Sequence, residues 1–474
     1  MSLKNGTERL LAMIRGGEPM TVGQKVRLAV MLSVPSVVAQ MSSIVMQYID
    51  ASMVGSLGAE ASASIGLVST TTWLFGGLLS SAAAGFSVQV AHLFGANNMD
   101  GARRVMRQGV VSVLAFSLLI ACIGAAISPF LPGWLGGDLS IRHDASIYFL
   151  IISLCLPALQ MEFLACGMLR CSGNMHVPSM AGVVMCLLDV LFNFFLIFPT
   201  RIASVFGMAV TIPGAGLGVE GAALGTVLAE IVVVVWLMWY LCCRSKVLRL
   251  DTLRGWRQSL VDTLRKAVKI GFPMGLEHGV ICGAQIAVTT IVAPLGVCSL
   301  AANSFAITAE SLCYMPGYGI GEAATTLVGQ SVGARRRDLT LSFARITVGM
   351  GIGVMALMGV LMYVAAPEII GLMTPVEEIR ELGVMVLRIE AFAEPMFAAS
   401  IVAYGVCVGA AYTMRPCLLN MLSIWVVRLI TAASLAPTMG LRGVWIAMCI
   451  ELIFRGASFL VLLWRRRWLK SVPE

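Results

Sequence analysis

Charged side chains are scarce in this sequence. They make up 12% of its 474 residues, whereas soluble domains carry about 25%. A soluble protein of this length would have too few charges to cover its surface, but a surface that faces lipid needs none. Because 58% of the residues are hydrophobic, the composition predicts an integral membrane protein and argues against a soluble globular one.

The sequence also lacks the motifs of several functional classes. No CxxC pair is present and most of the 13 cysteines lie in apolar runs, so neither a disulfide framework nor a zinc site is expected. Four histidines and no HExxH string argue against an intramembrane enzyme, and the missing P-loop argues against an ATP-driven pump. The net charge of +8 does not indicate nucleic-acid binding, because the basic residues sit in short loops.

Long apolar runs are what the sequence has instead. A helix needs about 20 mostly apolar residues to cross the hydrocarbon core. Twelve such segments are expected, near residues 28–49, 61–93, 108–130, 145–169, 177–199, 215–243, 267–293, 299–330, 346–367, 382–409, 416–437 and 443–464. The second and eighth exceed one straight span, so part of each is expected to be ordered loop or interfacial helix. The predicted fold class is therefore an all-α integral membrane protein with twelve transmembrane helices.

The positions of lysine and arginine predict the orientation in the membrane. Cytoplasmic loops carry an excess of these residues. If the N-terminus is cytoplasmic, most of the 33 basic residues fall on the cytoplasmic side. The outer loops then hold only Arg142, Arg201, Arg380 and Arg442. We expect a multi-pass protein of the cell membrane, the inner membrane where there are two, with both termini cytoplasmic.

The two halves of the chain repeat each other at a fixed offset. Residues of the same type recur 238 positions apart in the pairs Pro35 and Pro273, Gly58 and Gly296, Gly95 and Gly333, and Pro178 and Pro416. Six spans in each copy give both copies the same orientation. Such a duplication predicts two pseudo-symmetric six-helix lobes with a substrate site between them.

These boundaries divide the chain into five parts. The parts are a cytoplasmic N-terminal segment (1–27), an N-lobe (28–243), a cytoplasmic inter-lobe loop (244–266), a C-lobe (267–464) and a cytoplasmic tail (465–474).

Several motifs resemble those of multidrug and toxic compound extrusion (MATE) transporters, which belong to the MOP superfamily. Pro35, Asp50 and the V-G-x-L-G turn at 54–58 resemble the start of these proteins. The stretch GMLRCSGNMHVP at 167–178 is similar to their G-x-L-R-x-x-G-x-x-x-x-P pattern, and KIGFPMGLE at 269–277 resembles their seventh span. The stretch GVCVGAAYTMRP is the second copy of GMLRCSGNMHVP, and it has no arginine at the position of the motif arginine in G-x-L-R.

The resemblance covers nearly the whole chain. It implies two six-helix lobes, alternating access, and export of cationic amphiphiles driven by a proton or sodium gradient.

The first span carries a polar stripe. Ser36, Gln40, Ser43, Gln47 and Asp50 recur at steps of four and three, which places them on one face of a helix. Such a stripe is expected to line a wet cavity or a tight polar interface. Gln40, Gln47 and Asp50 are therefore candidates for binding cation or substrate. The alternative for Asp50 is a solvated carboxylate at the outer end of the span.

Asp189 and Asn193 are four residues apart in the fifth span and share a face. The proton-linked branch of the MATE family often has Asn first and Asp four residues later, so the two types are exchanged here. Together with Asp50 they are expected to form an N-lobe carboxylate site. Burial favours the protonated form of a carboxyl group, and a cationic compound would compete with the proton.

The second lobe holds further candidates. Glu277 and His278 follow Pro273, which should break the seventh helix locally. Sodium-linked relatives use a glutamate in this helix, so a sodium ion at Glu277 is a further hypothesis. His278 is interpreted as a packed polar residue. Glu310 shares a face of the eighth span with Asn303.

Acidic and basic residues also occur together in later spans. Glu390 and Glu394 lie beside Arg388, where an internal ion pair and a transport role are both open. Glu451 and Arg455 are four apart and are expected to form a structural pair. The remaining cation, Arg428, has no partner that the sequence identifies.

The sequence thus predicts a secondary active efflux transporter that exports organic cations by antiport and is not an enzyme. The alternative is a flippase of lipid-linked saccharides from the same superfamily, although such relatives usually have extra spans and a basic cavity. No cofactor is expected besides a coupling proton or sodium ion. The expected partners are small organic cations and the lipid bilayer, without nucleic acid, and the expected state is a monomer.

Overall fold

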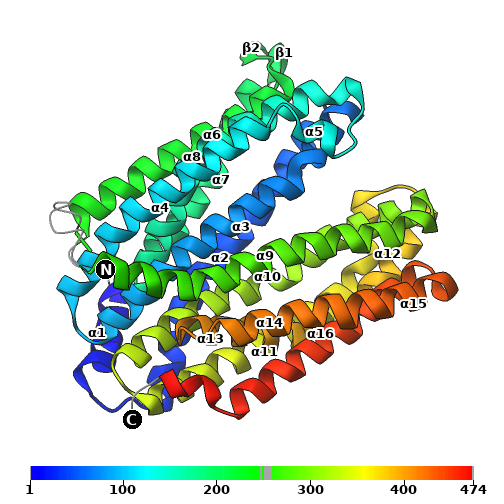
Figure 1. Ribbon diagram of the computed structural model, residues 1–474. Helices are drawn as coiled ribbons and strands as arrows, with labels where there is room; N and C mark the ends of the chain where they lie inside the picture. Colours follow the sequence, from blue (N-terminus) through cyan, green and yellow to red (C-terminus); the bar gives the residue numbers. More distant parts are fainter. Residues whose placement is uncertain (1, 206–207, 246–247, 250–258, 472–474) are drawn as a thin grey trace.

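The computed structural model describes residues 2–205, 208–245, 248–249 and 259–471. Parts of the expected inter-lobe loop (246–247 and 250–258) and the end of the expected tail (472–474) lie outside the described residues, as does Met1. The described chain is almost entirely helical (Figure 1).

The first half contains α1 (Ser2–Gly16), α2 (Val22–Gly55), α3 (Ala59–Gly95), α4 (Met99–Ile127), α5 (Leu131–Trp134), α6 (Leu139–Cys171), α7 (His176–Leu196), β1 (Pro199–Val205), β2 (Met208–Ala215) and α8 (Gly218–Trp239). The second half contains α9 (Leu260–Val292), α10 (Val297–Gly333), α11 (Arg337–Met373), α12 (Glu377–Glu390), α13 (Glu394–Gly409), α14 (Met414–Leu422), α15 (Leu429–Met439) and α16 (Leu441–Trp464). A π-helical turn over residues 423–428 joins α14 to α15.

Among the described residues, ten helical segments are long and apolar enough to cross a membrane, and the pair α12 and α13, bent by 59°, forms an eleventh span. The 37-residue α10 runs beside α9 (Figure 1) and completes the twelve helices of the predicted fold. The loop after α7 forms a two-stranded antiparallel hairpin, which the sequence did not predict.

The helices form two bundles. Figure 1 shows α2–α8 in one and α9–α16 in the other, with the bundles converging at the end that carries both termini and diverging toward the β1–β2 end. Each bundle has its own apolar core, with Met106, Met168 and Leu237 buried in the first and Trp445 and Phe459 in the second. Close van der Waals packing of these side chains stabilises each bundle separately.

The two bundles touch along α3, which packs on α9, and along α10, which packs on α2. Two glycines that the repeat relates, Gly95 and Gly333, lie at the crossing of α3 and α10. A Cβ atom added at Gly95 would overlap the carbonyl oxygen of Gln330, and one at Gly333 would overlap that of His92. Glycine at both positions therefore lets α3 and α10 cross in backbone contact.

The N-terminal segment contains a helix that the sequence did not predict. Leu10, Leu11 and Ile14 of α1 are buried in a cluster that includes side chains of both bundles. Arg336 of the second bundle donates a hydrogen bond to the carbonyl oxygen of Glu18 at 2.6 Å. The converging end of the molecule is therefore covered by α1.

The crossing of α3 and α10 yields a test of stability. Gly333→Ala is expected to destabilise the protein by about 1–3 kcal/mol, because the added methyl group overpacks the contact. Gly349→Ala is the matched control, since no atom lies within 4 Å of a Cβ there. Thermal unfolding in detergent measures both variants, and an unfolding midpoint of Gly333→Ala equal to that of the control would contradict this account of the crossing.

Candidate functional site

Three side chains from α2 and α7 form a polar cluster inside the first bundle. The amide nitrogen of Asn193 donates hydrogen bonds to Asp50 Oδ1 at 3.0 Å and to Asp189 Oδ2 at 3.1 Å. The carboxyl groups of Asp50 and Asp189 also contact each other. Asp189 and Asn193 are fully buried, and Asp50 is partly buried. We call these three residues the N-lobe acidic cluster.

The two carboxyl groups of this cluster lack a basic partner among the described residues, and this determines what they can bind. Within the described part of the chain, neither carboxyl group forms an ion pair with lysine or arginine, and Asp189 Oδ1 has no hydrogen-bond partner. Two ionised carboxylates in contact repel each other strongly away from water. The arrangement is therefore suited to hold a proton or a small cation between them.

The other predicted residues of the α2 stripe lie apart from this cluster. Gln40 donates a hydrogen bond to Glu322 Oε1 at 3.2 Å, across the contact between the bundles. Ser36 donates to the other oxygen of Glu322. Gln47 is exposed. The stripe thus divides between the interior of the first bundle and its contact with the second, instead of lining one cavity.

An ion pair joins the two bundles where Gln40 reaches across. Arg170, in the last turn of α6, lies 2.5 Å from Glu322 of α10, and both side chains are about one-quarter exposed. Arg170 belongs to the motif at 167–178, whereas Glu322 was not among the predicted site residues. The repeat offers no signal, because Ala84 stands 238 residues before Glu322. The sequence feature that could have identified Glu322 is its position as a carboxylate inside the apolar run 299–330.

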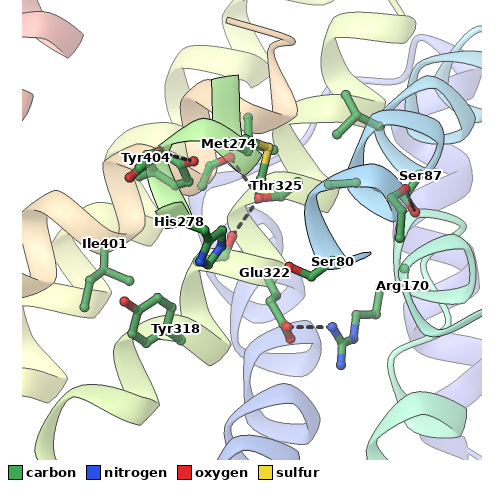
Figure 2. A pocket seen from close by; sticks show the side chains of 18 of the residues that line it. Ser80, Ser87, Arg170, Met274, His278, Tyr318, Glu322, Thr325, Ile401 and Tyr404 are labelled. Carbon is green, nitrogen blue, oxygen red and sulfur yellow. Dashed lines mark hydrogen bonds and ion pairs between the residues drawn. The ribbon is translucent and has the colours of Figure 1, made fainter. Parts of the chain in front are cut away.

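A cavity of about 390 Å³ lies between the bundles and contains this ion pair. Figure 2 shows Ser80, Ser87 and Arg170 on one side and His278, Tyr318, Glu322 and Tyr404 on the other. We call it the central cavity. Because both bundles contribute to its wall, a movement of one bundle against the other would change its shape and its access.

Glu277 lines the central cavity and is held in place by two neutral donors. Its Oε2 accepts a hydrogen bond from the Tyr404 hydroxyl at 2.8 Å, and its Oε1 accepts one from the Asn420 amide at 2.6 Å. His278 packs against the backbone of α3, where a Cβ at Gly77 would lie 2.6 Å from the His278 ring. His278 also lines the central cavity, so its structural role stays an interpretation.

A second acidic cluster lies in the second bundle at a break in a helix. Glu390 ends α12 and Glu394 begins α13, and both are fully buried. Within the described residues, none of their four carboxyl oxygens has a hydrogen-bond partner. Glu310 of α10 lies near both of them. It lines a smaller cavity of about 190 Å³ together with Asn303. We call Glu310, Glu390 and Glu394 the C-lobe acidic cluster.

The basic residues near this cluster have other partners. Arg388 points away from Glu390 and Glu394, donating to the Tyr363 carbonyl oxygen at 3.3 Å with its guanidinium over the Tyr363 ring. The ion pair that the sequence left open at Arg388 is therefore not formed with these glutamates.

Glu451 is the partner that the sequence could not identify for Arg428. It lies 3.5 Å from Arg428 and 3.0 Å from Arg455, and it accepts a hydrogen bond from Ser423 at 2.6 Å. The predicted pair of Glu451 and Arg455 is confirmed as part of this larger group.

Removing the shared carboxylate tests its structural role. Glu451→Gln leaves Arg428 and Arg455 without their anion in the interior, so we expect a loss of about 3–5 kcal/mol of stability. Glu378→Gln, on an exposed surface, is the matched control. Thermal unfolding of the two purified variants gives the comparison, and equal unfolding midpoints would show that Glu451 is not the anchor of this group.

Comparison with known proteins places these features in a family. The family model named MatE matches residues 35–195 and 273–433, two segments that are offset by 238 residues at both ends and together cover more than half of the chain. This offset is the one that the sequence repeat predicted.

Named relatives and solved structures match over nearly the full length. A protein named probable multidrug resistance protein NorM from Thermotoga maritima is 22% identical, covering 89% of this chain and 88% of the relative. The protein of the same name from Idiomarina loihiensis is 27% identical, covering 88% of each chain. A structure titled as an outward-facing conformation of a multidrug resistance MATE family transporter superposes with a TM-score of 0.88 at 19% identity, covering 97% of this chain and 98% of that one.

Proposed function

The chain belongs to the MatE family, and from this premise we propose that it is a secondary active multidrug efflux transporter that exports organic cations by cation-coupled antiport. The printed names of its relatives, probable multidrug resistance proteins, support the cargo class. The two bundles with a cavity between them support alternating access. One observation supports cation coupling, namely that Asp50 and Asp189 share the side-chain amide of Asn193 as their hydrogen-bond donor.

A proton is the coupling ion that this geometry favours. A single proton on either aspartate relieves the repulsion between the two carboxylates, and the Asn193 amide can donate to the acceptor oxygens that remain. Neutralisation by a proton needs no further ligands. A metal ion, by contrast, would need several oxygen ligands around it.

Sodium at Glu277 is the second candidate, but its surroundings favour it less. Both carboxylate oxygens of Glu277 already accept hydrogen bonds from Tyr404 and Asn420. A bound sodium ion would have to displace these donors or share the same oxygens with them. We therefore assign proton coupling to the N-lobe acidic cluster.

The central cavity supports a cationic, amphiphilic cargo. Its volume of about 390 Å³ falls in the range of roughly 300–1,000 Å³ found for drug-sized ligands. Phe163, Tyr318 and Phe397 supply aromatic faces, which attract organic cations. Among the described residues of the wall, Glu277 is a carboxylate with no salt bridge at contact distance.

The basic residues of the cavity argue against the flippase alternative. A lipid-linked diphosphate would need guanidinium groups that are free to bind phosphate. Arg170 pairs with Glu322 at 2.5 Å and Arg455 with Glu451 at 3.0 Å. The guanidinium groups of the wall are therefore already paired with carboxylates.

The orientation follows from the basic loops. We place both termini in the cytoplasm, so the converging end of the bundles, covered by α1, is the closed cytoplasmic side. The bundles diverge toward the opposite end, so we place the access to the cavity on the outer side. A monomer is sufficient for this mechanism, because one chain supplies both bundles and the cavity between them.

The role of Asp50 can be tested in cells. Asp50→Asn is expected to abolish drug resistance, down to the level of a host without the transporter, because the amide cannot exchange a proton. Glu60→Gln, which alters an exposed carboxylate at the start of α3, is expected to keep resistance. Growth in a cationic drug and the amount of protein in the membrane fraction are measured together. Full resistance from Asp50→Asn at normal membrane levels would remove Asp50 from the mechanism.

The role of Glu277 can be tested by binding. Glu277→Gln keeps an acceptor for Tyr404 and Asn420 but loses the charge, so the Kd for a cationic dye is expected to rise about tenfold, as loss of a charge-assisted contact predicts. The Kd for an uncharged analogue of the dye is expected to stay unchanged. Fluorescence titration of the purified variant compares both ligands, and an equal change in both Kd values would show that the charge of Glu277 is not used.

A further inference from the structure

One face of α6 carries polar side chains through the interior of the first bundle. Tyr148, Cys155 and Glu162 are spaced seven residues apart and so lie on one helix face. At 1.5 Å per residue, they extend over roughly 21 Å of the bundle, about two-thirds of the hydrocarbon thickness. The face therefore runs through most of the membrane.

The outer end of this face meets the N-lobe acidic cluster. Tyr148 interacts electrostatically with both Asp50 and Asp189. Cys155, one step further inward, lies within electrostatic range of Glu162 and of Glu230 on α8. The polar face thus connects the aspartates near the outer side with a pair of glutamates in the inner half of the bundle.

Glu162 and Glu230 form a buried carboxyl pair that the proposed function has not used. Their side chains contact each other between α6 and α8. Glu230 is 5% exposed, and its Oε1 has no hydrogen-bond partner in the described structure. As at Asp50 and Asp189, two ionised carboxylates in contact would repel each other, whereas one shared proton joins them by a hydrogen bond.

The charged and titratable groups around the pair are few. Those that interact with the pair electrostatically include Cys155, Cys166 and Arg170 on α6 itself. Arg170 is engaged by Glu322 at 2.5 Å. A proton is therefore the simplest ligand that can neutralise the pair.

We propose that Glu162 and Glu230 form a second proton-binding site in the first bundle, which receives protons that enter at the N-lobe acidic cluster. The step is a simple exchange: a proton leaves one carboxyl group and binds one carboxylate, with no other bond made or broken. The inference rests on the proton coupling proposed above. It explains how a proton taken up near the outer side moves toward the cytoplasmic half.

Infrared spectroscopy tests the site directly, without drug or coupling. Protonated carboxyl groups absorb at a carbonyl stretch that is resolved from ionised carboxylates. In pH-difference spectra of the purified transporter, we expect a protonated-carboxyl band that is reduced in the double variant Glu162→Gln/Glu230→Gln. The band should remain in Asp50→Asn and in Glu220→Gln, a matched change near the outer end of α8. Other buried carboxyl groups contribute to this band in every variant, so a double variant whose band equals that of the wild type would overturn the proposal.

Transport tests whether the site is used. The double variant is expected to lose proton-driven efflux in everted vesicles while it still binds a cationic dye. Glu230→Asp, which keeps a carboxyl group, is expected to retain both the infrared band and efflux, and it provides the test if the double variant fails to fold. Undiminished efflux from a folded double variant would overturn the relay. Wild-type vesicles that show no proton-driven efflux, with the band present, would instead refute the coupling proposed for the transporter.

Discussion

The cost of holding a carboxylate away from water governs this structure. The described residues meet this cost in three ways. Glu451 and Glu322 are paired with arginines, and Glu277 accepts hydrogen bonds from neutral donors. Asp50 and Asp189 instead contact each other. Only the third arrangement is relieved by binding and releasing a cation, which is why it is suited to energy coupling whereas the first two hold the fold together.

The repeat explains how two bundles can move against each other. Each has its own apolar core, so each remains folded when the contact between them changes. That contact includes backbone crossings at Gly95 and Gly333, the partly exposed pair of Arg170 and Glu322, and the apolar cluster beneath α1 at the converging end. A few such contacts at one end allow the other end to open.

Features set by spacing along one helix could be predicted from the sequence. The apolar runs predict the twelve spans, and the fixed offset predicts the duplication. The four-residue spacing of Asp189 and Asn193 places both on one helix face, and the structure brings Asp50 to them. Each of these signals is local or periodic, so it can be read without knowing how distant segments pack.

Features that join distant segments could not be predicted in this way. Arg170 and Glu322 are 152 residues apart and belong to different bundles, so no spacing rule links them. Arg428 and Glu451 meet only because the π-helical turn at 423–428 packs on α16. The helix α1 was missed because its apolar side is short and gains its burial only against both bundles.

The central claim is that buried carboxylates exchange a proton for cationic cargo. Accumulation of a cationic drug in everted membrane vesicles, under a proton gradient alone and under a sodium gradient alone, tests it most directly. The account predicts accumulation with the proton gradient and none with the sodium gradient. Accumulation with sodium alone, and none with protons alone, would contradict it.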